Sequence, residues 1–194
     1  MKLFFCFLFS LSMLHSAADT LDLSGQWGFA IDPLNAGITD RWYNQILPES
    51  LRLPGSLQEQ GFGDIPSATT EWTSGIGMTL LSDPRFADAI HGTPFRCPFW
   101  LTPERHYSGP AWYQRDIAIP EEWANQQILF TLERPHWQTT LWIDQNKLGS
   151  QDSLAVPHRY NLSKWVRPGQ IHRLTLRIDN RYIIPVGKDA HSIS

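Results

Sequence analysis

The feature that most constrains the fold is an alternation of side chains near the C-terminal end of the chain. Leu174, Leu176 and Ile178 are apolar, and the residues between them, Thr175 and Arg177, are polar. A period of two is that of a β-strand with one buried face, whereas a helix would repeat every 3.6 residues. We therefore predict a strand here, with Leu176 against a core and Thr175 facing solvent.

The same period recurs upstream, over 113–119, 128–132 and 141–143. Asp144-Gln145-Asn146-Lys147 and Pro168-Gly169 interrupt the apolar runs as turns. Strands about 10 to 15 residues apart are typical of a sandwich or barrel. No amphipathic run is long enough for a confident helix, and we expect only single helical turns at 84–90 and 121–126. The sequence therefore predicts an all-β domain.

Residues 54–110 form a stretch far longer than an ordinary connection between strands. The stretch is rich in Gly, Pro, Ser and Thr, but it also contains aromatic residues such as Phe62, Trp72 and Trp100. Disordered segments are poor in aromatic residues. We therefore expect one long, ordered insertion within a single domain.

The first 18 residues read as a secretory signal peptide. Met1-Lys2 supply a positive charge, an apolar run follows to Leu14, and the small residues Ser16-Ala17-Ala18 precede the predicted cleavage site. An apolar run of ~12 residues is too short to span a bilayer, which needs ~20. We expect cleavage after Ala18, export to the periplasm or the exterior, and no membrane span in the mature chain.

The charge and cysteine content narrow the class further. The chain has a net charge of −3 at pH 7 and no cluster of Lys and Arg, which argues against a nucleic-acid partner. Cys6 leaves with the signal peptide, so Cys97 remains without a disulfide partner in the chain. We interpret Cys97 as a small buried apolar side chain rather than a nucleophile.

No segment carries a recognisable catalytic or cofactor motif. The sequence lacks G-x-S-x-G, a phosphate-binding glycine loop and H-E-x-x-H, and its histidines are too far apart for local metal-ligand spacing. Glu121 and Glu122 would face opposite sides of an extended segment, so they would not act as a carboxylate pair on one substrate bond. We assign no catalytic residue, metal or cofactor.

Five blocks, in order from residue 21 to 180, resemble the N-terminal domain of glycoside hydrolase family 2, which includes β-galactosidases and β-glucuronidases. The pair Gln145-Asn146 departs from the Asn-Gly that is usual in the fourth block. The blocks are Leu23-Ser24-Gly25-Gln26-Trp27, Leu51-Arg52-Leu53-Pro54-Gly55-Ser56, Gly109-Pro110-Ala111-Trp112-Tyr113-Gln114-Arg115, Leu141 to Gly149 and Leu174 to Asn180.

This resemblance implies a jelly-roll β-sandwich over 19–180 that binds sugar, followed by a tail over 181–194 that leads toward a missing downstream domain. In the family, that later part is a (β/α)8 barrel with the two catalytic glutamates of a retaining hydrolase. Segments around Trp72, Trp100 and 184–193 resemble a β-galactosidase-like branch.

The carbohydrate partner would therefore meet Asp189 and His191 in the tail and the faces of Trp72 and Trp100. Ordinary linker or core roles are the alternatives for these four residues, because tryptophan is highly buried on average and exposed charges are common. The alternatives for the whole chain are a stand-alone carbohydrate-binding module and an inactive truncated product.

Overall fold

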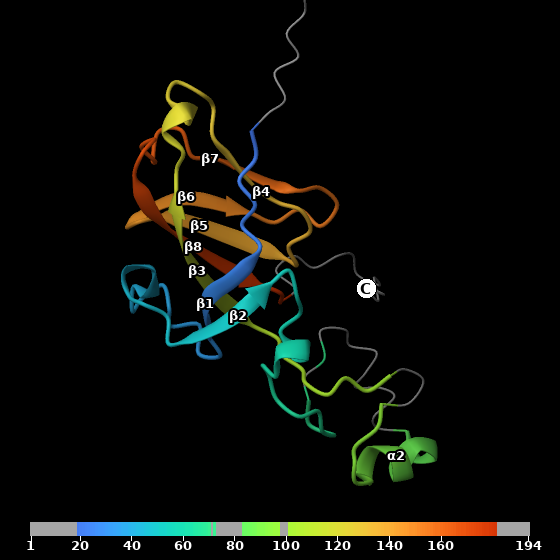
Figure 1. The fold of residues 1–194 in the computed structure, drawn as a ribbon. Coiled ribbons are helices and arrows are strands. Elements are labelled where there is room, and N and C mark those ends of the chain that lie inside the picture. The colour runs from blue at the N-terminus through green and yellow to red at the C-terminus, as the bar shows by residue number, and fades with distance from the viewer. Residues whose placement is uncertain (1–18, 71, 73–82, 98–100, 182–194) are drawn as a thin grey trace, which may run out of the picture.

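The computed structural model describes residues 19–70, 72, 83–97 and 101–181, which form a two-layer antiparallel β-sandwich with an insertion extending from it (Figure 1). The larger sheet has the strand order β2-β1-β3-β8-β5-β6, and the smaller sheet pairs β4 with β7. The predicted all-β sandwich is confirmed. The strands are β1 (Gly25–Ile31), β2 (Glu49–Leu53), β3 (Pro110–Ala118), β4 (Leu129–Leu132), β5 (Gln138–Ile143), β6 (Asn146–Gln151), β7 (His158–Asn161) and β8 (Ile171–Asp179).

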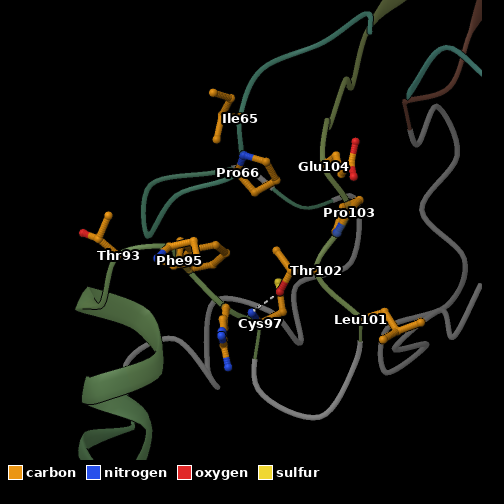
Figure 2. Close-up of a pocket in the computed structure, with 11 residues that line it drawn as sticks. Ile65, Pro66, Thr93, Phe95, Cys97, Leu101, Thr102, Pro103 and Glu104 are labelled. Atoms are coloured by element: carbon orange, nitrogen blue, oxygen red, sulfur yellow. Dashed lines mark hydrogen bonds between the residues drawn. The ribbon is translucent and has the colours of Figure 1, made fainter. Parts of the chain in front are cut away.

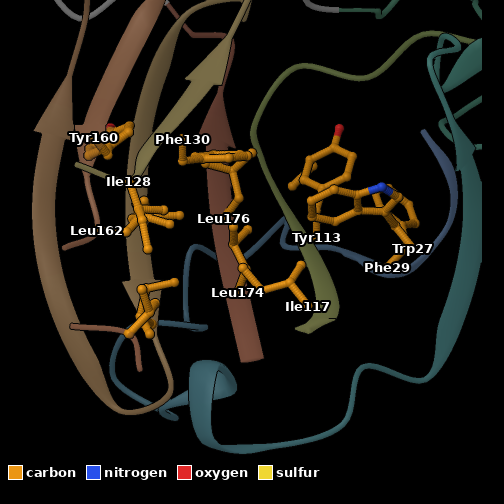
Figure 3. Close-up of a cluster of buried hydrophobic side chains, with 14 of the residues drawn as sticks. Trp27, Phe29, Tyr113, Ile117, Ile128, Phe130, Tyr160, Leu162, Leu174 and Leu176 are labelled. Atoms are coloured by element: carbon orange, nitrogen blue, oxygen red, sulfur yellow. The ribbon is translucent and has the colours of Figure 1, made fainter. Parts of the chain in front are cut away.

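The main core lies between the two sheets. Phe130 of β4 and Tyr160 of β7 face Leu174 and Leu176 of β8 (Figure 3). Leu174 and Leu176 are almost completely buried, which confirms the inner face that the alternation predicts. Burying one such side chain contributes about 1.5–3 kcal/mol, so this layer supplies much of the stability.

The outer face of β8 is buried as well, which corrects the prediction that Thr175 faces solvent. Thr175 is fully buried, and its hydroxyl oxygen accepts a hydrogen bond from Nε2 of Gln114 at 3.2 Å. The cause is the connection between β1 and β2, which folds back over the larger sheet. Leu47 and Trp42 of this connection pack in a second cluster against Trp112, with Ala30, Trp142 and Tyr43 completing it.

Asp32, 1% exposed, holds the connection in place. Its carboxylate accepts hydrogen bonds from the backbone N–H groups of Ala36 (2.7 Å) and Gly37 (2.9 Å) and from Nε1 of Trp112 (2.9 Å). A Cβ atom on Gly37 would lie 2.6 Å from Nε1 of Trp112, so only glycine permits this approach. The second cluster therefore depends on contacts between residues about 80 positions apart in sequence.

The helical elements within the described residues are all short. They are the single turns η1 (Trp42–Asn44), η2 (Gln58–Gln60), η3 (Pro84–Phe86), α2 (Ala87–His91) and η4 (Glu121–Trp123), and they confirm the helical turns predicted at 84–90 and 121–126. Within the described ranges no helix has the length and apolar character needed to cross a membrane. The predicted signal peptide, residues 1–18, lies outside those ranges.

The insertion leaves β2 and returns to β3, with α2 at its far end (Figure 1). Its two arms are joined by a pair of backbone hydrogen bonds, from Asp64 N to His106 O (2.8 Å) and from His106 N to Asp64 O (2.9 Å). Gly63 has φ of +105°, and a Cβ atom there would lie 2.6 Å from His106 O. Cys97 is buried within the insertion, as predicted.

Candidate functional site

The first part of the candidate site is the point where the chain leaves the sandwich after β8. The side chain of Asn180 accepts a hydrogen bond from Gly109 N (2.7 Å) and donates one to Tyr107 O (2.9 Å). These bonds tie the end of β8 to the segment that returns from the insertion. The exit of the chain is therefore fixed relative to the insertion that carries Trp72.

Asp179 lies between two guanidinium groups at this exit. Its carboxylate accepts hydrogen bonds from Nη2 of Arg177 (2.9 Å) and from Nε and Nη2 of Arg181 (2.9 and 2.7 Å). Burial opposes ionisation, but the hydrogen bonds from Arg181 and both positive charges outweigh it and hold the pKa of Asp179 below its usual range. Arg177 also donates to Oδ1 of Asn35 (2.8 Å), so the β1–β2 connection meets this group.

Tyr107 connects the same region to Asp32, which bonds Trp112 of the second cluster. Its hydroxyl donates to Pro110 O (2.7 Å) and accepts from Asp32 N (3.0 Å). Burial raises the pKa of Tyr107 to about 12. The hydroxyl therefore stays protonated at neutral pH, which suits a structural role and not that of a general base.

Trp72 is the one predicted sugar-stacking residue within the described ranges. Its ring is half-buried and lies 4.6 Å from the ring of His106, at an interplanar angle of 47°. His106 is the residue that closes the two arms of the insertion through its backbone. Trp72 therefore packs on the base of the insertion, and one of its faces is engaged with a protein side chain.

A hollow of about 690 Å³ lies farther out in the insertion. Figure 2 shows Pro66, Phe95, Cys97 and Thr102 around it, with the backbone N–H of Cys97 donating to Oγ1 of Thr102 (2.7 Å). The wall also includes the exposed side chain of Leu101. This hollow is mostly apolar, and such a surface suits the packing of a carbohydrate face or of protein.

The other predicted site residues, Trp100, Asp189 and His191, lie outside the described residues. Of the four candidates, the structure therefore places only Trp72. Asn180, which fixes the direction in which the tail begins, was not singled out as a site residue. The sequence feature that could have identified Asn180 is its position at the end of the fifth block, directly after Asp179.

Several other ionisable residues in the described ranges are engaged in local contacts or exposed. No group of three or more His, Cys, Asp or Glu side chains in this part of the chain is arranged to hold a metal ion. His158 is bonded through its ring to Thr139 and Ser153 O, and His172 to Asp144 and Arg167 N. Glu121 and Glu122 lie exposed in the 3-10 turn η4, within the helical turn that the sequence predicts.

The five blocks that carry the family resemblance all fall in the larger sheet. They correspond to β1, the end of β2, the start of β3, the β5–β6 hairpin and β8. Their polar residues hold the fold: Nη1 of Arg115 donates to Leu23 O (2.6 Å) and Ser24 O (2.8 Å), and Trp112 bonds Asp32. These polar residues of the blocks therefore contribute to the architecture of the larger sheet.

Comparisons with known proteins find β-glucuronidases among the proteins that this chain is similar to. A β-glucuronidase of Paenibacillus borealis is 19% identical over 159 residues, covering 82% of this chain and 21% of the relative. A β-glucuronidase of Rattus norvegicus is 21% identical over 179 residues, covering 85% of this chain and 22% of the relative. The chain thus spans about a fifth of the length of the curated relatives it matches. No protein-family model matches the chain.

Solved structures share the fold. Ruminococcus gnavus β-glucuronidase superposes with a TM-score of 0.57 at 21% sequence identity, over 81% of this chain and 20% of that protein. A structure of the same enzyme with D-glucuronic acid gives a TM-score of 0.55. These matches confirm the resemblance to glycoside hydrolase family 2 and agree with an N-terminal domain of such an enzyme.

Proposed function

We propose that this chain is the N-terminal, sugar-binding domain of a retaining glycoside hydrolase and contributes no catalytic residue of its own. The observation that carries the proposal is the fit between five ordered sequence blocks and one sheet, in a fold shared with β-glucuronidases. The similarity to β-glucuronidases supports a glycoside hydrolase domain, and we propose that this domain works within a larger enzyme.

Retaining hydrolysis needs two carboxyl groups ~5–5.5 Å apart, one as acid/base and the other as nucleophile. By the family resemblance, these would lie in a downstream barrel. A sandwich domain assists such a site by walling the pocket and bonding sugar hydroxyls, which positions the ring and excludes water. Asn180 and Asp179 support this role, because their hydrogen bonds fix the end of β8 and Arg181.

Within this proposal, Asp189 and His191 bond sugar hydroxyls, and Trp72 and Trp100 offer faces for stacking. A carboxylate accepts bonds from two neighbouring hydroxyls, and a histidine donates or accepts. The contact between Trp72 and His106 leaves Trp72 the weaker candidate of the two tryptophans, because the ring is half-buried and already packed.

The proposed substrate is a β-glycoside. The segments around Trp72, Trp100 and 184–193 favour a β-galactoside, whereas the relatives found by comparison are named β-glucuronidases. A uronic acid carries a carboxylate that a galactose ring lacks, so the two classes separate cleanly in an assay. The polypeptide encoded by the complete gene can be assayed with paired chromogenic β-galactoside and β-glucuronide substrates. The substrate that it turns over decides between the two classes.

The purified chain tests the absence of catalysis directly. Residues 19–194 should release no chromophore from either glycoside above the uncatalysed rate. Turnover that is lost on changing a carboxylate of this chain, such as Glu122→Gln, would refute the assignment. Tight binding of an oligosaccharide by the same preparation would favour the alternative of a stand-alone carbohydrate-binding module.

We also propose export, with cleavage after Ala18, on the strength of the N-terminal sequence pattern. Mass spectrometry of the mature N-terminus tests this. A protein that begins at Asp19 in the periplasmic or secreted fraction supports it, and an intact Met1 in the cytoplasmic fraction contradicts it.

A further inference from the structure

The two sheets of the sandwich are unequal. The smaller sheet has only β4 and β7, whereas the larger sheet has six strands. Five apolar side chains of the core remain only partly buried beside β4: Leu23, Leu53, Leu57, Leu132 and Ile178. Part of the inner face of the larger sheet therefore lacks a facing strand in the described part of the chain.

Two hollows occupy this place, and both run along β4. One of about 780 Å³ lies between β4 and the strands β1 and β2, and one of about 670 Å³ lies between β4 and residues 19–23. Phe130, Thr131 and Glu133 line both hollows, so they form one groove, which we call the β4 groove. Its floor includes the buried rings of Trp27 and Tyr113.

Every second residue of β4 directs its backbone N–H and C=O groups toward the β4 groove. Ile128 O accepts a hydrogen bond from Leu162 N at 2.8 Å. In the antiparallel register, the backbone N–H and C=O groups of Phe130 and Leu132 therefore also point toward β7. The N–H and C=O groups of Leu129, Thr131 and Glu133 point the other way. Within the described residues no backbone hydrogen bond reaches them. A free edge beside an apolar groove is the template for strand addition.

We propose that a segment of the same polypeptide, C-terminal to Arg181, adds to the free edge of β4 as the third strand of the smaller sheet. Its inward side chains would be apolar, since they would meet Trp27, Leu53 and Phe130. This inference rests on the β4 edge alone and does not depend on the proposed glycosidase function.

The position of the chain's exit favours an intramolecular strand. Asn180 lines the β4 groove, and Asp179 O accepts a hydrogen bond from Trp137 N (3.1 Å), close to the loop that follows β4. Covalent attachment gives such a segment a millimolar effective concentration. A second copy fits less well, because its own β4 edge lies in an equal recess between residues 22–24 and 54–58.

Hydrogen exchange of the polypeptide encoded by the complete gene tests the strand. The amides of Leu129, Thr131 and Glu133 should be protected by ~100-fold or more over an exposed amide. Those of Phe130 and Leu132, which bond β7, are the internal reference. Fast exchange of the first set beside slow exchange of the second would overturn the proposal.

A matched pair of variants at position 131 distinguishes the loss of the backbone N–H from a change of the side chain. Thr131→Pro removes only the N–H that points into the β4 groove, as proline on a strand edge does, whereas Thr131→Val keeps it. Thr131→Pro should abolish protection of Leu129 and Glu133 and leave Leu132 protected. Unchanged protection of Leu129 and Glu133 in Thr131→Pro would contradict strand addition.

The source of the strand is settled by cross-linking, which also remains informative if Thr131→Pro fails to fold. A photo-reactive residue at position 131 should link to a peptide C-terminal to Arg181 within the same molecule, in a mixture of isotope-labelled and unlabelled protein. Links to a labelled second copy, or to residues before β4, would overturn the proposal.

Discussion

Removal of the Asp32 carboxylate tests whether the second cluster, around Trp112 on the outer face of the larger sheet, stabilises the domain as a core does. Asp32→Ala deletes the acceptor for three donors: the N–H groups of Ala36 and Gly37, and Nε1 of Trp112. Trp112 is fully buried and Gly37 is buried, so these two donors have no ready access to water.

The expected loss follows from the number of stranded donors. A buried donor left without a partner costs about 1–3 kcal/mol, so two such groups predict a loss of about 2–6 kcal/mol. The whole free energy of unfolding of a domain is typically about 5–15 kcal/mol. Asp32→Ala should therefore destabilise the domain severely, and Asp32→Asn, which keeps one acceptor oxygen, by an intermediate amount.

Urea unfolding monitored by tryptophan fluorescence measures this loss, and Asp40→Ala is the matched control. Asp40 lies exposed in the same β1–β2 connection, so its removal should change stability by less than about 0.5 kcal/mol. If Asp32→Ala and Asp40→Ala unfold at the same urea concentration, the connection does not hold the outer face as described.

Three further outcomes follow from the same structure. Leu176→Asp and Thr175→Asp should both unfold the domain in thermal melts, because both side chains are buried and an unpaired buried carboxylate costs several kcal/mol; a wild-type melt for Thr175→Asp would restore the solvent-facing assignment. Because the folded pKa of Asp179 is lowered from 3.8, its contribution to stability is complete above that value and is lost as pH falls through the folded pKa. Urea unfolding at pH 6 and pH 3 should therefore show a smaller pH-dependent loss in Asp179→Asn than in the wild type, and equal losses would contradict the pairing with Arg177 and Arg181. In the complete enzyme, Asp189→Ala and His191→Ala should each lower kcat/KM by more than twofold with little change in Tm; a smaller effect, below ~0.4 kcal/mol, would make the tail a linker.

Local periodicity was enough to predict the inner face of the sandwich. Leu174 and Leu176 alternate with polar residues, and both lie in the main core. The turns at 144–147 and 168–169 were also predictable, because Asp, Asn, Pro and Gly favour turn geometry for local reasons.

The second cluster, on the outer face of the larger sheet, was not predictable from such patterns. Thr175 and Gln114 look like solvent-facing residues, yet both are buried. The side chain of Gln114 bonds the backbone of Trp42 and Leu47, which lie more than 60 positions away in sequence. A period of two identifies the two faces of a strand, but it cannot reveal that a distant connection covers the polar face.

The candidate site was predictable only in part. The sequence blocks indicated the domain and, through Asn180, where the chain leaves it. They did not reveal the β4 groove, because an unpaired edge depends on which strands are absent beside it, and no single segment encodes that. Trp72 illustrates a further limit, since its contact with His106 spans the two arms of the insertion.

The measurement that tests the central claim most directly is the hydrolysis of β-glycosides by the polypeptide encoded by the complete gene, with the anomeric form of the product followed by NMR. The account predicts that this polypeptide hydrolyses a β-galactoside or a β-glucuronide with retention of configuration, while residues 19–194 alone do not. Inversion of configuration, or turnover by residues 19–194 alone, would contradict it, as would a complete gene product that hydrolyses neither substrate.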